Sequence, residues 1–213
     1  MKNKSAFTMI ELVFVIVVLG ILASLAMGRM DRDLKQEASE SILSHMRLTQ
    51  QLALRDNKHR SDSSSNWQRA YWQIDFTCTS DCTYSVGSDL DLDGSLAMLE
   101  SAIDPVDGKY LWNDGGTDTD MSKKVLLENK FGIHTITPSS GCVTSNSIAF
   151  DYNGRPYLSI DTATNNFLTI MNTDCNLTFI MSTDEDNDGI DDQFIITIEA
   201  ETGYSFIYDQ NQS

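Results

Sequence analysis

Hydrophobic residues are distributed unevenly along this chain of 213 residues, and their longest continuous run lies near the amino terminus. No charged residue occurs over 12–28, a stretch that is about 25 Å long as an α-helix at roughly 1.5 Å per residue. That length is at the short end of what crosses a bilayer. Glu11 stands one turn inside the apolar run, where a carboxylate is costly in lipid and needs a partner. We therefore expect a transmembrane helical segment over about 7–28.

The next segment, 29–58, contains neither proline nor glycine and follows a helical period. This period predicts one buried face with polar residues mostly off it. The face consists of Leu34, Ala38, Ile42, Met46, Thr49 and Ala53, and the polar set of Glu37, Glu40, Arg47, Gln50 and Arg55. We expect one continuous helix over 7–58, embedded at its start and packed on a globular domain through its amphipathic part.

After a polar loop at 59–66, the pattern changes to short alternating runs typical of strands. Strands are predicted at 70–77, 83–86, 124–128, 131–137, 146–152, 155–160, 166–171, 177–182, 193–200 and 204–208. Asn153-Gly154 predicts a tight hairpin turn. The acidic, glycine-rich segment 87–122 is expected to be a surface insertion in which residues 90–103 form a short helix. The prediction is an α+β chain, with the long helix followed by an antiparallel, β-sandwich-like domain over 67–213.

The first residues carry a specific motif. A basic hexapeptide, 1–6, precedes Phe7-Thr8-Met9-Ile10-Glu11-Leu12. This segment resembles the leader and mature start of type IV pilins and type II secretion pseudopilins, in which the leader is removed before a Phe and the fifth mature residue is Glu. The resemblance implies cleavage between Ala6 and Phe7, methylation of the Phe7 amine, and assembly through Glu11. Ala6 stands where the family nearly always has Gly, and Gly28 where many pilins have a helix-bending Pro.

Two other interpretations of the amino terminus compete with this one. Ser24-Leu25-Ala26 has the small residues of an ordinary signal-peptide cleavage site, which would place the cut after Ala26. A plain membrane anchor explains the hydrophobicity as well. Glu11 inside the apolar run argues against an ordinary signal peptide. A plain membrane anchor gives no reason for a glutamate at this position.

A second resemblance covers the rest of the chain loosely. Phe150 to Pro156 is similar to the F-x-x-x-G-x-P segment of GspH/FimT-type minor pseudopilins, and Ile196 to Gly203 to their closing strand and turn. This resemblance implies a minor subunit of the fibre.

The negative charge of the chain restricts the classes of partner that it can bind. It carries 31 acidic and 15 basic residues, a formal charge of −16, and no Lys or Arg follows Arg155. Such a surface repels nucleic acid and attracts divalent cations. No motif for nucleophilic, zinc or nucleotide chemistry occurs, and His45, His59 and His134 have no carboxylate or cysteine at ligand spacing in the sequence. We expect a structural protein, with no catalytic residues and no direct nucleic-acid binding.

The four cysteines are an even number in a chain whose leader implies export, which favours disulfides. Cys78 and Cys82 are separated by three residues between two predicted strands, a spacing suited to a closed hairpin. We predict the pairs Cys78–Cys82 and Cys142–Cys175.

Two acidic loops suggest calcium as the one candidate cofactor. Hard cations need several converging oxygens, which D-x-D-x-D-G supplies on one turn. The first loop matches the EF-hand spacing with Asp89, Asp91, Asp93 and Glu100. The second resembles the calcium loops of thrombospondin-type repeats, with Asp184, Asp186, Asp188 and Asp192 as carboxylate ligands and the Ile190 carbonyl as a fifth.

The sequence therefore predicts a minor pilin or pseudopilin of the bacterial inner membrane, with its carboxyl-terminal domain in the periplasm. Its expected partners are prepilin peptidase and other pilin subunits, which contact its amino-terminal helix. One alternative is a FimT-like minor pilin of a DNA-uptake pilus. Another is an exported calcium-dependent binding module with an ordinary signal peptide.

Overall fold

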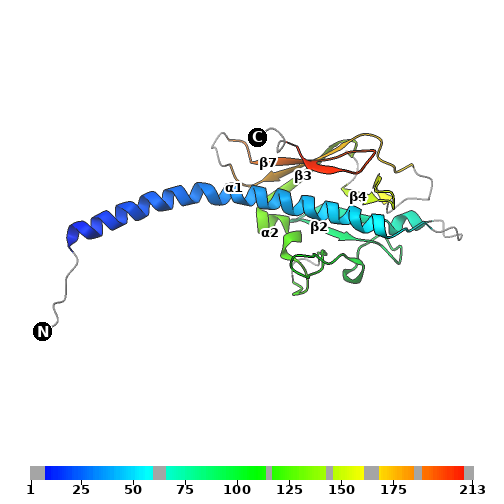
Figure 1. Cartoon of the computed structure of the whole chain (residues 1–213), viewed down its shortest axis with the longest axis horizontal. Helices are drawn as coiled ribbons and strands as arrows, with labels where there is room; N and C mark the ends of the chain where they lie inside the picture. The colour runs from blue at the N-terminus through cyan, green and yellow to red at the C-terminus, as the bar shows by residue number, and fades with distance from the viewer. Residues whose placement is uncertain are drawn as a thin grey trace.

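Helix α1 (Met9–Arg55) runs without interruption through Gly28 and joins an exposed amino-terminal half to the folded domain (Figure 1). The computed structural model describes residues 8–59, 66–113, 117–142, 146–160, 168–184 and 189–208, without the side chains of 25–33. The predicted face is buried at Ala38, Ile42, Met46, Thr49 and Ala53, while Leu34 is half-buried. The helical period therefore gave the correct orientation of α1 on the domain.

Two antiparallel sheets of four strands form the domain, in the orders β2-β1-β4-β5 and β3-β6-β7-β8. The α+β class and the antiparallel sheets predicted from the sequence are confirmed. The strands are β1 (Trp72–Cys78), β2 (Cys82–Gly87), β3 (Ile133–Ser140), β4 (Ser147–Phe150), β5 (Pro156–Leu158), β6 (Cys175–Met181), β7 (Gln193–Ile198) and β8 (Ser205–Ile207).

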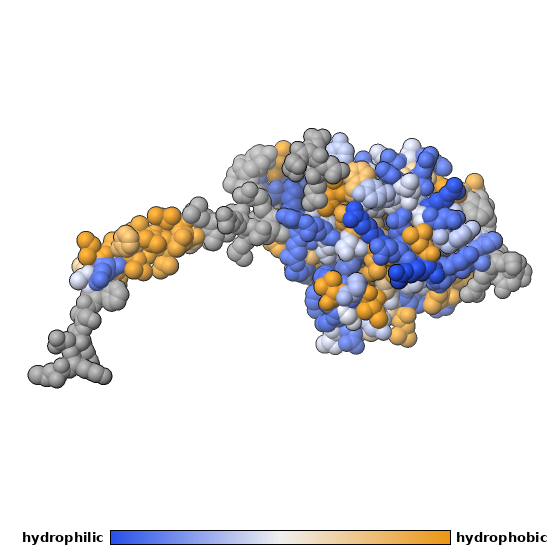
Figure 2. Space-filling view, viewed as in Figure 1, coloured by the Kyte–Doolittle hydropathy of each residue, from blue (hydrophilic) through white to orange (hydrophobic). Residues whose placement is uncertain are grey.

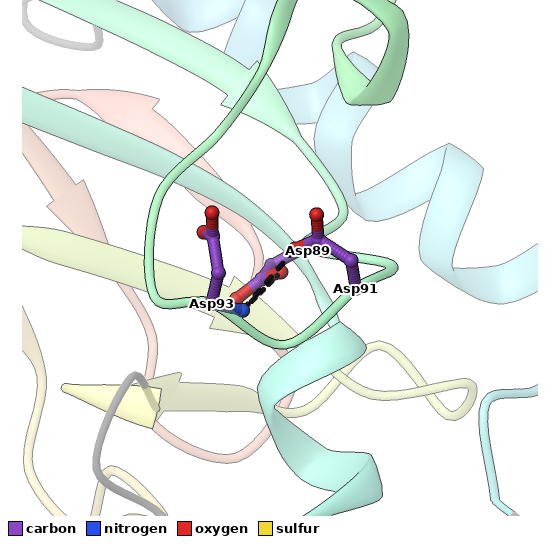
Figure 3. A group of neighbouring side chains, drawn as sticks. All are labelled: Asp89, Asp91 and Asp93. Atoms are coloured by element: carbon purple, nitrogen blue, oxygen red, sulfur yellow. Dashed lines mark hydrogen bonds between the residues drawn. The ribbon is translucent and has the colours of Figure 1, made fainter.

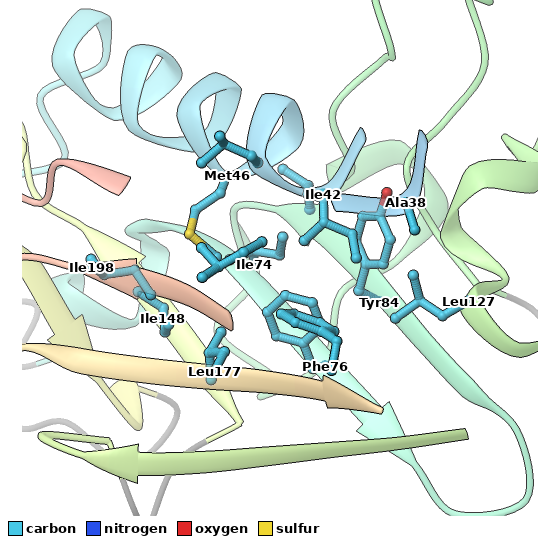
Figure 4. Packing of buried hydrophobic residues seen from close by; sticks show 14 of the residues in the cluster. Ala38, Ile42, Met46, Ile74, Phe76, Tyr84, Leu127, Ile148, Leu177 and Ile198 are labelled. Atoms are coloured by element: carbon cyan, nitrogen blue, oxygen red, sulfur yellow. The ribbon is translucent and has the colours of Figure 1, made fainter. Parts of the chain in front are cut away.

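The main core lies where α1 meets both sheets. Figure 4 shows Ile42 and Met46 of α1 directed toward Ile74 of β1 and Ile198 of β7. The rings of Phe76 in β1 and Phe179 in β6 are 5.6 Å apart, which links the two sheets below the helix. Each of these side chains is at most 3% exposed. Burial of this size, about 1.5–3 kcal/mol for each large apolar side chain, fixes the second half of α1 to the domain.

Three local predictions are wrong. The expected strand at 124–128 is instead the 3-10 helix η3 (Lys123–Val125) followed by α2 (Leu127–Phe131), which ends at the left-handed Gly132. Short apolar runs fit a buried helical turn as well as a strand. The expected helix within 90–103 is reduced to η2 (Met98–Glu100), because the preceding aspartates form a tight turn. At 168–171 the described residues form an isolated bridge between Tyr157 and Ile170 rather than a strand.

Segment 87–122 is also more closely integrated than a surface insertion. Ala102, Asp104, Leu111 and Met121 are each at most 5% exposed. In β2, the backbone amide of Val86 donates to the Leu111 carbonyl at 2.8 Å. The Val86 carbonyl accepts from the Ala102 amide, also at 2.8 Å. These bonds extend the first sheet beyond β2, so the segment belongs to the domain core.

Candidate functional site

The amino-terminal half of α1 carries an apolar surface that nothing in the folded domain covers. Large apolar side chains between Met9 and Leu22 are 36–89% exposed. Figure 2 shows this surface as a continuous hydrophobic region that projects away from the domain. Monomeric soluble proteins rarely expose contiguous apolar patches larger than a few hundred Å². A surface of this extent is suited to contact with lipid or with other apolar helices.

Glu11 lies near the start of this surface and has a partner in its own chain. Its Oε2 atom accepts hydrogen bonds from the backbone amide of Thr8 at 2.9 Å and from the Thr8 hydroxyl at 2.8 Å. Thr8 is the residue that precedes the first turn of α1, so Glu11 satisfies an amide that the helix itself leaves open. Thr8 was not identified as a partner from the sequence, although threonine followed three residues later by glutamate is a known helix-start signal.

Ala6 and Phe7, the residues of the predicted cleavage site, lie outside the described residues. Among the residues that the structure does describe, no helix is both long enough and apolar enough to cross a membrane.

A family model for the prokaryotic N-terminal methylation motif matches residues 1–27. This match covers the same segment that contains the exposed apolar surface, Glu11 and its Thr8 partner. The amino-terminal segment therefore carries a prokaryotic N-terminal methylation motif. The motif is typical of subunits of type IV pilin-like fibres, which are structural rather than enzymatic proteins. No curated protein and no solved structure matches the chain.

The first acidic loop brings three carboxylates together. Asp89, Asp91 and Asp93 each place one oxygen within 4.8 Å of the others. Figure 3 shows the three side chains grouped on one loop. Asp89 is 2% exposed, and its carboxylate accepts from the amides of Leu92, Asp93 and Gly94 at 2.7–3.2 Å. Burial raises the pKa of Asp89, and these amide bonds act in the opposite direction. The Asp89 carboxylate therefore organises the turn through hydrogen bonds with the backbone.

Glu100, the fourth predicted ligand of this loop, is engaged elsewhere. Its Oε1 accepts from the amides of Leu90 and Asp91 at 2.7 and 3.3 Å, and its Oε2 from the amide of Ala97 at 3.0 Å. Glu100 is not part of the cluster formed by the three aspartates. In this EF-hand-like loop, Asp89 and Glu100 thus accept hydrogen bonds from backbone amides. Calcium binding by the loop stays a prediction.

The second acidic loop is described only in part, because Asp186 and Asp188 lie outside the described residues. Asp184 accepts from the amide of Gly189 at 3.0 Å, which folds the loop back on itself. Asp192 accepts from the Thr183 hydroxyl at 3.1 Å, and its amide donates to the Thr183 carbonyl at 2.7 Å. Ile190 is 65% exposed. Calcium binding by this loop also remains a prediction.

Both disulfides join the cysteines that the sequence analysis paired. Cys78 ends β1 and Cys82 begins β2, so the first bridge closes a hairpin. Cys142 follows β3 and Cys175 begins β6, and the second bridge connects these paired strands. Its longer loop makes it the larger contributor, at about 3–4 kcal/mol in the chain-entropy description.

A buried polar group was missed entirely from the sequence. His45, on α1, is 3% exposed; its Nδ1 is hydrogen-bonded to the Tyr84 hydroxyl, and its Nε2 is 3.5 Å from the Asp104 carboxylate. Lys124 donates to the same carboxylate at 2.8 Å. No pattern signals this group, because its members are 39 to 79 positions apart from His45 in sequence. It stabilises the attachment of segment 87–122 to the helix.

Proposed function

We propose that this protein is a minor pilin or pseudopilin, anchored by α1 in the bacterial inner membrane with its β-rich domain in the periplasm. The observation that carries this proposal is the long exposed apolar surface of α1 from Met9 to Leu22, which includes Glu11 and lies within the matched methylation motif. In this proposal the apolar surface is covered by lipid before assembly and by the helices of other subunits in the fibre.

Glu11 gives this assembly its register. A carboxylate in an apolar bundle is costly unless a cation or several donors compensate it. In the free chain, the compensation comes from Thr8. In a fibre, the amine created at Phe7 of a neighbouring subunit offers a full positive charge at the same depth, which favours docking in one register. The machine served is a type II secretion or type IV pilus fibre.

The DNA-uptake alternative finds less support in the charge distribution, because no Lys or Arg follows Arg155. Proteins that bind nucleic acid need basic side chains at the contacting surface. A role in assembling such a pilus, without direct DNA contact, is compatible with the proposal.

The mass of the mature protein separates the pilin proposal from an exported module with an ordinary signal peptide. We expect the protein purified from a host that makes prepilin peptidase to begin at a methylated Phe7. Intact mass spectrometry measures this directly, and the protein from a peptidase-deficient strain provides the uncut control. A mature chain that begins at Met27, after a cut behind Ala26, would contradict the proposal.

A further inference from the structure

A cavity of about 350 Å³ lies where His59, beyond the end of α1, meets the segment 66–71 and the β4–β5 hairpin. Its volume is within the usual range for small-ligand sites, about 300–1,000 Å³. We call it the aromatic cavity; the lining residues on which the argument rests are His59, Trp67, Tyr71, Asp151, Arg155 and Tyr157. It involves neither the apolar half of α1 nor the acidic loops.

The walls of the aromatic cavity are rings held in fixed positions. The ring centroids of Trp67 and Tyr71 are 5.6 Å apart and those of Tyr71 and Tyr157 are 5.1 Å apart, both with edge-to-face geometry. The three side chains are at most 8% exposed and belong to a small hydrophobic cluster separate from the main core. His59 extends the series, with its ring centroid 4.6 Å from that of Trp67. Such walls are rigid and present apolar surface with polar tips.

A buried carboxylate lies among these rings. Asp151 is 4% exposed, and its Oδ1 accepts from the amides of Asn153 and Arg155 at 2.8 and 3.0 Å. Its Oδ2 accepts from the Tyr157 hydroxyl at a long 3.4 Å. Because a carboxylate has about four lone-pair positions, these contacts leave acceptor capacity on Oδ2. Burial, assisted by Asp151, raises the pKa of Tyr157 to about 12, so its hydroxyl keeps its proton at neutral pH.

The rim of the cavity adds exposed groups of mixed hydrogen-bonding type. His59, Tyr152, Asn153 and Arg155 are all exposed and line the cavity. The Arg155 charge balances that of Asp151, which is notable in a chain with a formal charge of −16. A cation would meet the guanidinium at the rim, and an anion would meet the carboxylate inside. A neutral ligand with several hydroxyl groups and apolar faces avoids both conflicts.

We propose that the aromatic cavity binds a neutral carbohydrate of one or two sugar units. A C–H face of the sugar would lie against the ring of Tyr152, which is 41% exposed, and its hydroxyls would donate to Asp151 and accept from Arg155 and Asn153. This inference goes beyond the fibre assignment and does not rest on it. The β4–β5 turn, which contributes Asp151 and Arg155, lies beside the carboxyl-terminal part of α1, far from its amino-terminal end (Figure 1). Assembly through the amino-terminal half of the helix therefore leaves the site accessible.

The test uses the full chain in octaethylene glycol monododecyl ether, a detergent without a sugar head group. Cellobiose and N,N′-diacetylchitobiose are titrated by isothermal calorimetry and observed by saturation-transfer NMR. Choline and inorganic phosphate are titrated in parallel as the cationic and anionic ligands. We expect at least one sugar to bind, with saturation transfer to its ring protons, and neither ion to bind.

Substitutions at the rim locate the binding. Asn153→Ala and Arg155→Ala remove exposed side chains while retaining the backbone amides that hold Asp151. Each should weaken sugar binding by about fivefold or more, the effect of one lost hydrogen bond. Asp151→Asn, which retains an acceptor for the turn, should weaken it at least as much. Tyr208→Ala is the matched control, since Tyr208 is 57% exposed but follows β8 in the other sheet.

Three results would overturn the proposal. Binding of choline or phosphate without either sugar would assign the cavity to another ligand class. Sugar binding that the rim variants leave unchanged would place it elsewhere on the protein. Failure of both sugars to bind the wild-type chain would remove the carbohydrate assignment altogether.

Discussion

Single residues determine how two hairpin turns meet α1. The Gln50 side-chain amide donates to the carbonyls of Gly154 at 3.0 Å and Thr202 at 2.8 Å, which lie in the β4–β5 and β7–β8 turns. Gly154 and Gly203 both have positive φ, and a Cβ on Gly203 would lie 2.3 Å from the Gly154 carbonyl oxygen. One glutamine and two glycines thus connect both sheets to the helix.

Replacing Gly203 tests this close approach. Gly203→Ala should lower the free energy of unfolding by about 2 kcal/mol or more, because it adds both left-handed strain and a clash with backbone. Gly108→Ala is the control, since its φ is +71° but no atom lies within 4 Å of the added Cβ. Thermal melts of both variants measure the difference. Equal destabilisation would show that the approach of the two turns contributes nothing.

The buried His45 makes stability depend on pH. Burial lowers its pKa below the ordinary value of 6.5, although Asp104 acts in the opposite direction. The unfolded chain therefore binds more protons at this residue than the folded chain below about pH 6.5. The stabilisation is complete above that pH and is lost as the pH falls through the lower, folded-state pKa.

We predict that the free energy of unfolding decreases as the pH is lowered from 7 toward 5, with a slope of at most about 1.4 kcal/mol per pH unit from His45. Denaturant melts at several pH values measure the slope. His45→Gln should flatten it, whereas His59→Gln, a substitution of an exposed histidine, should not. A His45→Gln slope equal to that of the wild type would contradict this account.

Among the elements, segment 87–122 differs most from its expected role. Its acidic composition predicts a solvated insertion, yet Asp104 is fully buried and receives the Lys124 ammonium. Burial alone would raise the pKa of Asp104, but the hydrogen bonds from Lys124 and from the Val106 amide hold it below its usual value. The acidic character is thus divided between a buried ion pair and an exposed loop.

The two acidic loops, at 89–100 and 184–192, remain candidate calcium sites. We predict that millimolar calcium raises the melting temperature of the full chain by a few degrees relative to a chelator. Without a twelfth-position glutamate the loop at 184–192 should bind with a Kd of about 10⁻⁴–10⁻³ M, so 5 mM calcium adds about 1–2 kcal/mol. A melting temperature that is indifferent to calcium would identify both loops as acidic turns.

Double substitutions show which of the two acidic loops causes an increase in melting temperature with calcium. Asp186→Ala with Asp188→Ala should remove most of the increase. Asp91→Ala with Asp93→Ala should leave it, because Glu100 and Asp89 are already engaged by backbone amides in the first loop. The reverse result would move the site to the first loop and contradict the assignment.

Across the whole molecule, sequence patterns over neighbouring residues predicted helices, turns and short disulfides. They did not predict contacts between residues far apart in the sequence. The helical period placed Ile42 and Met46 in the core, Asn153-Gly154 formed its turn, and the short Cys78–Cys82 spacing formed its bridge. The second resemblance marked the same turns that meet at Gln50, but the contact itself was not predictable.

The missed features depend on residues far apart in sequence. The His45–Asp104–Lys124 group and the aromatic cavity arise only when α1, segment 87–122 and the β4–β5 hairpin pack together. Thr8 is different, because its signal was present in the sequence. Its role was obscured by the expectation that Glu11 would find its partner in another subunit.

Assembly of α1 into a fibre through Glu11 is tested by the incorporation of a Glu11→Val chain. Sheared fibres and membranes from cells that express the assembly machinery are compared by quantitative immunoblot. Glu37→Val is the matched control, because Glu37 lies on the same helix and is 52% exposed in a surface pair with Lys130, which contributes little. Thr8→Val removes the hydrogen bond from the Thr8 hydroxyl to Glu11 but leaves the Glu11 carboxylate. It therefore distinguishes the role of Glu11 at the start of its own helix from its role between subunits.

We predict that Glu11→Val is inserted and cleaved normally but is at least tenfold depleted from fibres, while Glu37→Val and Thr8→Val are incorporated. Depletion of Thr8→Val to the same extent would assign the effect to the cap within the chain. Incorporation of Glu11→Val at the wild-type level would contradict the claim.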